Sequence, residues 1–181
     1  IVEDSKCVFS NCCQFTTSLA YGGDYDFSHC TFGNYWSYAS RDKGQLLLNN
    51  YLDAAGIQKK WNLNAMFNNC IIYGNKEDEI VLDNTASGSF SFDYFFNNCL
   101  LKTTLTTSGT NYLNIIKNPA EVTVNGQSHD PVFNDPDHND FHLFEQSAAL
   151  NNGVIISGLE TDLEGNNRDA NPDLGAIEFM P

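Results

Sequence analysis

Phe67-Asn68-Asn69-Cys70-Ile71-Ile72 is the stretch of sequence that decides the predicted fold, because three other segments align with it without gaps. Each copy reads Phe, a small polar residue, Asn or His, Cys, any residue, and then usually an apolar residue. The other copies are Phe9-Ser10-Asn11-Cys12-Cys13-Gln14, Phe27-Ser28-His29-Cys30-Thr31-Phe32 and Phe96-Asn97-Asn98-Cys99-Leu100-Leu101. A short β-prone segment that recurs in this way is typical of a solenoid, in which each turn of the chain stacks on the previous one.

A second repeated segment precedes two of these copies. Gln45–Asn50 (QLLLNN) matches Glu79–Asn84 (EIVLDN), and Asn114–Asn118 is a weaker third copy. These runs are short, rich in β-prone residues and bounded by Asn, Gly and Asp, and no stretch has a convincing helical period. We therefore predict an all-β fold, a single-stranded parallel β-helix, with its coils in residues 1–129.

Stacking at about 4.8 Å per strand would turn equivalent residues into columns along the axis. We expect the residue two after each Cys to point inward with it, because side chains alternate along a strand. The Asn before each Cys suits a turn, where its amide can bond to bent backbone. The predicted columns are Phe9, Phe27, Phe67 and Phe96; Cys12, Cys30, Cys70 and Cys99; Gln14, Phe32, Ile72 and Leu101; and Asn11, Asn69 and Asn98.

The cysteine column is better explained by packing than by chemistry, since small free Cys side chains are common in narrow cores. Six cysteines without a CxxC pair do not have the spacing of a zinc site. Cys7 and Cys13 fall outside the predicted column, which leaves a disulfide between them open.

The last third of the chain changes character, and its motifs run in a fixed order. Asp130-Pro131-Val132-Phe133 leads to Asp140-Phe141-His142-Leu143 and to Ser147-Ala148-Ala149-Leu150-Asn151-Asn152-Gly153. The chain then closes with Asp162-Leu163-Glu164-Gly165-Asn166-Asn167-Arg168 and Asp173-Leu174-Gly175-Ala176-Ile177-Glu178.

This order resembles the C-terminal part of bacterial surface proteins of the choice-of-anchor Q type, which have the pectin-lyase-like fold. The match covers about residues 130 to 179, and Ala148 stands where the family often has Pro. The resemblance implies a right-handed helix, secretion or display on a bacterial cell surface, and residues 130–181 as the last coil and an irregular cap. It implies no activity, because this fold carries enzymes and passive stalks alike.

Charge and hydropathy narrow the classes of partner. The chain has 9 Lys and Arg against 23 Asp and Glu, a formal net charge of -14. A polyanion would be repelled, so we expect no nucleic-acid partner and a handicap for acidic polysaccharides. No apolar run reaches the roughly 18 residues of a membrane span. Because residue 1 runs almost directly into a coil, we expect upstream coils of the same polypeptide.

The most suggestive insertion is Gly33–Gly44, which gathers aromatic and cationic side chains. Aromatic rings stack on sugar rings, and adjacent polar groups can bind the hydroxyls. The alternative is that the rings pack the loop onto its own coil. The candidate substrate-binding residues are Tyr35, Trp36, Tyr38 and Arg41.

Catalytic and metal-binding signatures are weak. The sequence predicts no cofactor, although calcium could bind among the oxygen donors Asp162, Glu164, Asn166, Asp169 and Asp173. A lyase would need a base such as Arg41, Lys43, Lys102 or Lys117, and a hydrolase two carboxylates such as Asp24 and Asp26. We therefore expect a glycan-binding or structural module, with a polysaccharide lyase or glycoside hydrolase, or an adhesin for a protein partner, as alternatives.

Overall fold

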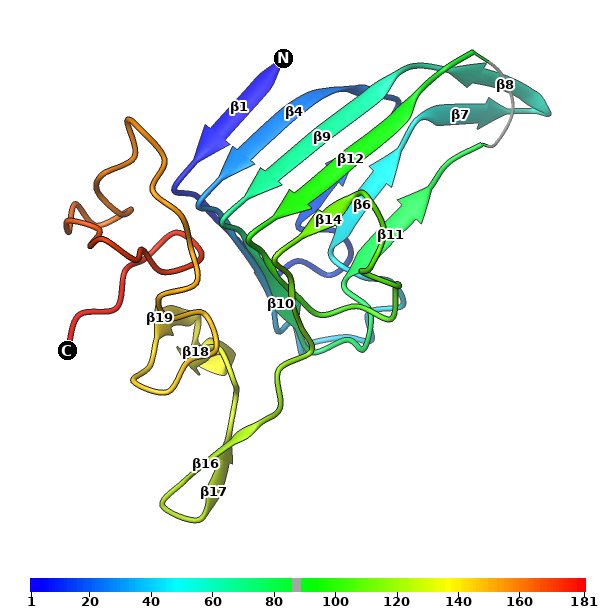
Figure 1. Cartoon of the computed structure of the whole chain (residues 1–181). Helices are drawn as coiled ribbons and strands as arrows, with labels where there is room; N and C mark the ends of the chain where they lie inside the picture. The colour runs from blue at the N-terminus through cyan, green and yellow to red at the C-terminus, as the bar shows by residue number, and fades with distance from the viewer. Residues whose placement is uncertain (86–88) are drawn as a thin grey trace.

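The computed structural model describes residues 1–85 and 89–181 and has an all-β architecture with parallel sheets, as predicted (Figure 1). The first sheet contains β1 (Val2–Ser5), β4 (Gly23–Ser28), β9 (Leu63–Asn68), β12 (Phe92–Asn97) and β14 (Tyr112–Leu113). The second contains β2 (Val8–Ser10), β5 (Thr31–Asn34), β10 (Ile71–Gly74), β13 (Leu100–Leu101) and β15 (Ile116–Lys117). The third contains β3 (Thr17–Leu19), β6 (Leu46–Asn49) and β11 (Ile80–Asp83).

The chain passes through these sheets in a repeating order. Each turn adds one strand to the first sheet and then one to the second, and each of the first three turns also adds one to the third. Three antiparallel hairpins are added to this frame: β7 (Tyr51–Ala54) with β8 (Ile57–Lys60), β16 (Val122–Val124) with β17 (Gln127–His129), and β18 (Phe133–Asp135) with β19 (Asp140–Leu143). The helical segment that the structure describes is one 3-10 turn, η1 (Pro136–His138), and no described helix is long and apolar enough to cross a membrane.

A stack of aromatic rings runs through the core between the sheets. Phe67 lies 5.3 Å from Phe27 and 4.7 Å from Phe96 between ring centroids, with the rings nearly parallel. Tyr112 continues the stack 5.7 Å beyond Phe96. The predicted column of Phe27, Phe67 and Phe96 is therefore correct, because in-register pairing of β4, β9 and β12 places these residues side by side.

The first copy of the repeat was aligned wrongly. Phe9 pairs with Phe32 in the second sheet and stacks on it at 4.9 Å, whereas Asp4 lies beside Phe27 in the first sheet. The prediction failed because Phe9-Ser10-Asn11 has the sequence pattern of the end of a first-sheet strand but lies in β2, the following strand, which belongs to the second sheet. The third copy assigned to Asn114–Asn118 was also wrong, since β15 belongs to the second sheet beside β13.

The same shift changes the cysteine column. Cys30, Cys70 and Cys99 are fully buried, as predicted, but Cys12 is exposed. Because Val8 pairs with Thr31, Cys7 lies beside Cys30 and takes the position in the column that was predicted for Cys12. All six cysteines are free, so Cys7 and Cys13 form no disulfide. The buried thiols donate to carbonyls of neighbouring strands, as from Cys70 Sγ to Phe27 O at 3.4 Å, which supports a packing role.

One turn position between the first and second sheets requires a left-handed backbone. Its occupants have φ near +50°: Lys6 (55°), His29 (52°), Asn69 (54°), Asn98 (49°) and Asn114 (52°). Asn tolerates this conformation better than most residues. Side chains at this position also bond to one another, as from Asn114 Nδ2 to Asn98 Oδ1 at 3.0 Å. The sequence placed Asn69 and Asn98 correctly in this turn, whereas Asn11 lies in a different one.

His29 should make the protein sensitive to acid. Burial, and then the charge of Arg168, lower the pKa of His29 from 6.5 to about 3. The unfolded chain therefore takes up a proton between these values while the folded chain does not, so stability is lost as the pH falls below 6.5. We expect the unfolding free energy to fall between pH 7 and pH 4 by about 3 kcal/mol more in the wild type than in His29→Asn.

Urea denaturation of both proteins across this pH range measures the difference. Asn is the natural replacement, because it occupies this turn position in three later turns of the chain. Parallel pH profiles for the two proteins would show that His29 is protonated equally easily in the folded and unfolded states.

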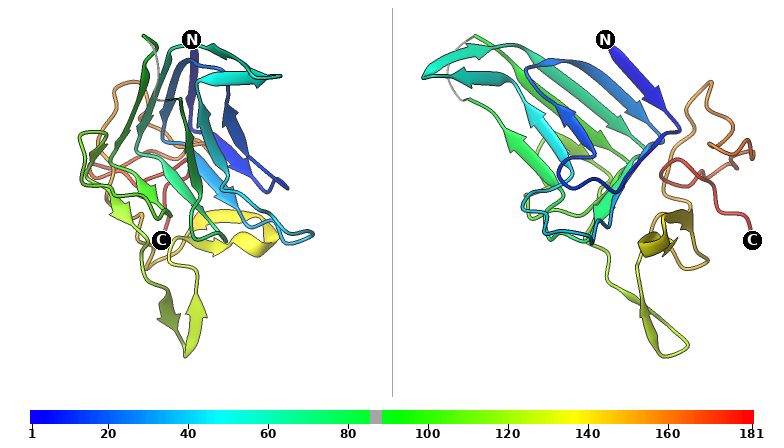
Figure 2. Two further views of the ribbon diagram at one scale, coloured as in Figure 1. Left: turned by 90° about the vertical axis from the view of Figure 1, so that its right-hand side faces the viewer. Right: turned by 180° about the vertical axis from the view of Figure 1, so that it is seen from behind.

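The C-terminal segment, expected to form the last coil and an irregular cap, packs against the second sheet. Figure 2 shows it, in orange and red, beside the sheets. Its Val132, Phe133 and Leu174 form an apolar cluster with Ile71 and Leu100, which point outward from the second sheet. Gly175 comes so close that an added Cβ would lie 2.6 Å from Thr31 Oγ1. The tail therefore covers the outer face of the second sheet.

Candidate functional site

Arg41 is not available to a ligand in the predicted loop. It is 2% exposed, and its two terminal nitrogens each lie 2.7 Å from an oxygen of Glu79. The guanidinium also donates to the backbone carbonyls of Asn34 and Lys43 and to Asn75 Oδ1. Its assignment as a substrate-binding residue is therefore corrected: Arg41 holds the loop onto the second and third sheets.

Tyr35 is likewise occupied by internal contacts. Its hydroxyl donates to Asp130 Oδ2 at 2.6 Å, and its ring packs against Phe133 and Phe141 of the tail. Burial, followed by the negative charge of Asp130, raises the pKa of Tyr35. Tyr35 therefore anchors the tail.

Tyr38 is the most exposed of the four predicted residues, and Trp36 is half-buried, as Tyr35 is. Tyr38 is 89% exposed, and its ring meets that of Trp36 edge to face at 5.2 Å. Farther along the same loop, Ser40, Asp42 and Lys43 line a pocket of about 180 Å³ with residues 13–15. The structure thus leaves Tyr38, and Trp36 in part, open to a ligand.

A column of exposed aromatic side chains lies at another corner of the molecule, where each turn of the chain enters the first sheet. The register pairs Gly23 with Leu63 and Leu63 with Phe92, and an aromatic residue stands two positions before each of these three. Those residues are Tyr21, Trp61 and Phe90, which are 52%, 38% and 50% exposed. We call these three residues the aromatic ladder.

The ladder repeats along the direction in which the strands stack. Backbone hydrogen bonds tie its strands together, from Gly23 N to Asn62 O and from Leu63 N to Ser91 O. Tyr21 and Trp61 are in contact, with ring centroids 6.0 Å apart. Since neighbouring strands are about 4.8 Å apart, the ladder offers an apolar surface to an extended ligand lying across the strands.

A polar column lies on the outer face of the first sheet, three residues after each member of the ladder. Asp24, Asn64 and Asp93 pair side by side on β4, β9 and β12, and all three are exposed. Their oxygens and amide can exchange hydrogen bonds with hydroxyl groups. Aromatic faces beside such groups form the surface that sugars require, with C–H groups on the rings and hydroxyls on the polar atoms.

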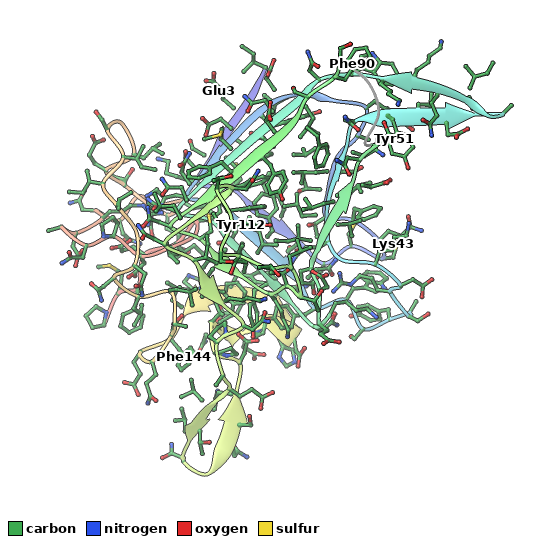
Figure 3. The ribbon with its side chains drawn as sticks, turned by 45° about the vertical axis from the view of Figure 1, so that its right-hand side comes forward. Glu3, Lys43, Tyr51, Phe90, Tyr112 and Phe144 are labelled. Carbon is green, nitrogen blue, oxygen red and sulfur yellow. The ribbon has the colours of Figure 1, made fainter. Side chains whose placement is uncertain are left out.

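The β7–β8 hairpin projects beside the ladder and leads directly into Trp61. Tyr51, at its base, donates to Asp83 Oδ1 at 2.9 Å, which fixes the hairpin to the third sheet. Figure 3 shows Tyr51 and Phe90 at this end of the molecule and Lys43, from the predicted loop, at a different corner. The ladder and the predicted loop are therefore separate surfaces.

The residues considered for calcium use their oxygens in hydrogen bonds within the tail. Asp162 accepts from the backbone amides of Glu164, Asn166 and Glu178. Asp173 likewise accepts from the amides of Asn151 and Phe179. In residues 1–85 and 89–181, no group of three or more His, Cys, Asp or Glu side chains is arranged to hold a metal ion.

The bases and acids considered for catalysis are spread over the molecule. Lys102 Nζ donates to Gly74 O and lies over the ring of Tyr73, and Lys117 Nζ donates to Leu105 O. Asp24 and Asp26 share the outer face of β4, as their spacing predicted, and both are exposed. Lys43 lines the pocket of about 180 Å³ with Asp42, whereas Asp26 lines a separate one with Glu3 and Asp4.

Comparison with protein-family models, curated proteins and solved structures finds no match to this chain. The function is therefore argued from the geometry of its own residues.

Proposed function

We propose that this chain is a module of a right-handed parallel β-helix, secreted or displayed on a bacterial cell surface, that binds a neutral polysaccharide along the aromatic ladder. The helix is supported by the repeated passage through three parallel sheets in one order. The right hand and the surface location are supported by the tail motifs that resemble choice-of-anchor Q proteins.

The observation that carries the binding function is the exposed aromatic ladder. Tyr21, Trp61 and Phe90 are 38% to 52% exposed, although burial would stabilise large aromatic side chains. A row of rings at equivalent positions on successive strands suits a repetitive ligand better than a single small molecule.

Charge selects the class of polysaccharide. Asp24 and Asp93 are exposed on the same sheet, three residues after Tyr21 and Phe90, and the whole chain carries a formal net charge of -14. An anionic chain would be repelled both at the surface and during its approach, whereas neutral hydroxyl groups can donate to these carboxylates. We therefore expect binding to cellulose, mannan or xylan-type neutral chains and not to pectate.

Removal of the central ring tests the proposal. Trp61→Ala should weaken binding to the retained neutral polysaccharide about tenfold, because loss of a buried aromatic contact costs on the order of 1–2 kcal/mol. Affinity electrophoresis through gels containing each polysaccharide measures the change. Trp36→Ala, in the loop at the other corner, is the matched control and should leave the affinity unchanged.

The same experiment separates the alternatives. If Trp36→Ala weakens binding and Trp61→Ala does not, the ligand occupies the predicted loop and the ladder has no role. Release of reducing or unsaturated ends during incubation would instead identify an enzyme. Absence of retention on every polysaccharide would contradict glycan binding and favour a structural module or an adhesin for protein.

A further inference from the structure

A second cavity lies between the tail and the turn that contains His29. Its volume is about 140 Å³, and its lining combines apolar and polar side chains. The apolar part is formed by Ile155, Ile156, Leu159 and Pro172, and the polar part by His29, Arg168, Glu160 and Asp169. The cavity contains no residue of the aromatic ladder.

The hydrogen bonds of Asn69 determine which nitrogen of His29 carries the proton. Asn69 Oδ1 accepts from Val154 N, and its Nδ2 donates to Val154 O, so the orientation of the amide is fixed. The same Nδ2 lies 2.8 Å from His29 Nε2, which must therefore be the acceptor. His29 is neutral at ordinary pH, since burial lowers its pKa to about 3, so its proton is on Nδ1.

This Nδ1–H group is a buried donor without an acceptor among the described residues. His29 is 0% exposed, and Nδ1 makes no hydrogen bond. The carbonyls of Gly175 and Asp173 are near enough to raise the pKa of His29 against the effect of burial, but neither has hydrogen-bond geometry to Nδ1. A buried donor left in this way costs free energy unless a ligand or solvent supplies an acceptor.

Arg168 brings a second donor of the same kind to the cavity. Its side chain is 3% exposed, and its terminal nitrogens bond to Glu178 Oε2 and to the carbonyls of Asp173, Gly175 and Ala176. Its Nε–H, however, is buried without a partner. Because Glu178 neutralises the guanidinium, the two free N–H groups present donors without a net positive charge.

We propose that this cavity binds the acetamido group of an N-acetylated sugar, with its carbonyl oxygen facing the N–H groups of His29 and Arg168. A carbonyl oxygen has two lone pairs, which match two donors. The methyl group suits the wall of Ile155, Ile156 and Leu159. Glu160 and Asp169, both exposed, can accept from the amide N–H and would repel a carboxylate ligand.

The test follows the side-chain N–H groups of His29 and Arg168 by NMR of the full ¹⁵N-labelled chain. N-acetylglucosamine and N-methylacetamide should each shift both resonances in a saturable way. Glucose, which has a hydroxyl in place of the acetamido group, should bind at least about tenfold more weakly, because it leaves the paired donors unsatisfied.

Two variants locate the effect. Leu159→Phe narrows the cavity and should abolish the shifts, whereas Leu163→Phe, at an exposed tail position that does not line the cavity, should preserve them. Trp61→Ala should also preserve them, so this site and the ladder are tested independently. If Leu159→Phe does not fold, the comparison of N-acetylglucosamine with glucose decides alone.

The proposal is overturned if N-acetylglucosamine produces no saturable shift, or if glucose produces the same shift with the same affinity. A crystal structure grown with N-acetylglucosamine that shows only water against His29 Nδ1 and Arg168 Nε would overturn it as well.

Discussion

Phe67→Ala should lower the free energy of unfolding by about 4 kcal/mol, because it removes the central ring of the core stack. Phe67 is fully buried between Phe27 and Phe96, and neither neighbour can move into the gap without leaving its own strand register. The lost apolar contact and the cavity left behind therefore both contribute. Urea denaturation followed by tryptophan fluorescence measures the change.

Two substitutions control this prediction. Phe67→Leu fills most of the space and should cost less than half as much as Phe67→Ala. Phe90→Ala removes a ring that is 50% exposed and should change the unfolding free energy by less than about 1 kcal/mol. Equal losses for Phe67→Ala and Phe90→Ala would show that the stack does not form the core.

Arg41→Ala should lower the free energy of unfolding by about 3–5 kcal/mol, because it leaves the carboxylate of Glu79 buried without its counterion. Both side chains are almost completely inaccessible, at 1% and 0% exposed. The substitution also removes donors from the carbonyls of Asn34 and Lys43. The effect should be one on stability and not on affinity for a ligand.

The double variant Arg41→Met with Glu79→Leu tests the cause. Removing both charges should be less destabilising than Arg41→Ala alone, since no unpaired charge is left. The remaining loss comes from the carbonyls of Asn34 and Lys43, which lose a donor, and from the amide of Lys76, which loses Glu79 Oε1 as its acceptor. If Arg41→Ala leaves stability unchanged and instead abolishes polysaccharide retention, Arg41 contacts the ligand and the burial argument fails.

Substitutions in the aromatic ladder and in the cavity at His29 should differ in their effect on stability. The aromatic ladder is exposed on the first sheet, so its substitutions should change binding with little change in folding. The cavity at His29 and Arg168 lies where the tail meets the second turn of the chain, so its substitutions affect both. Binding measurements on this protein therefore need a stability measurement on the same variant.

Several features of the fold followed from the sequence alone. Strand alternation has a period of two, so each Cys of the last three copies had to share a face with the residue two positions later, and Phe32, Ile72 and Leu101 are indeed buried with the cysteines. Asn at the residue before Cys favoured a turn, and Asn69 and Asn98 lie in one, with left-handed backbone. These features depend on neighbours within a few residues, which is why a local pattern reports them.

The aromatic ladder could have been found in the sequence. Tyr21, Trp61 and Phe90 stand at the same offset before Phe27, Phe67 and Phe96. The repeat that predicts the fold consists of apolar residues expected to be buried, and aromatic residues repeated on the surface are not part of it. Exposure itself could not be predicted, because it depends on which segments cover each corner.

Tertiary structure alone decided the rest. Arg41 is buried because it forms an ion pair with Glu79 from the next turn of the chain. In the first turn, Phe9 pairs with Phe32 rather than with Phe27. The tail covers the second sheet because Ile71 and Leu100 present an outward apolar face to it. Each outcome depends on contacts between residues far apart in sequence, and local residue preference carries no information about such contacts.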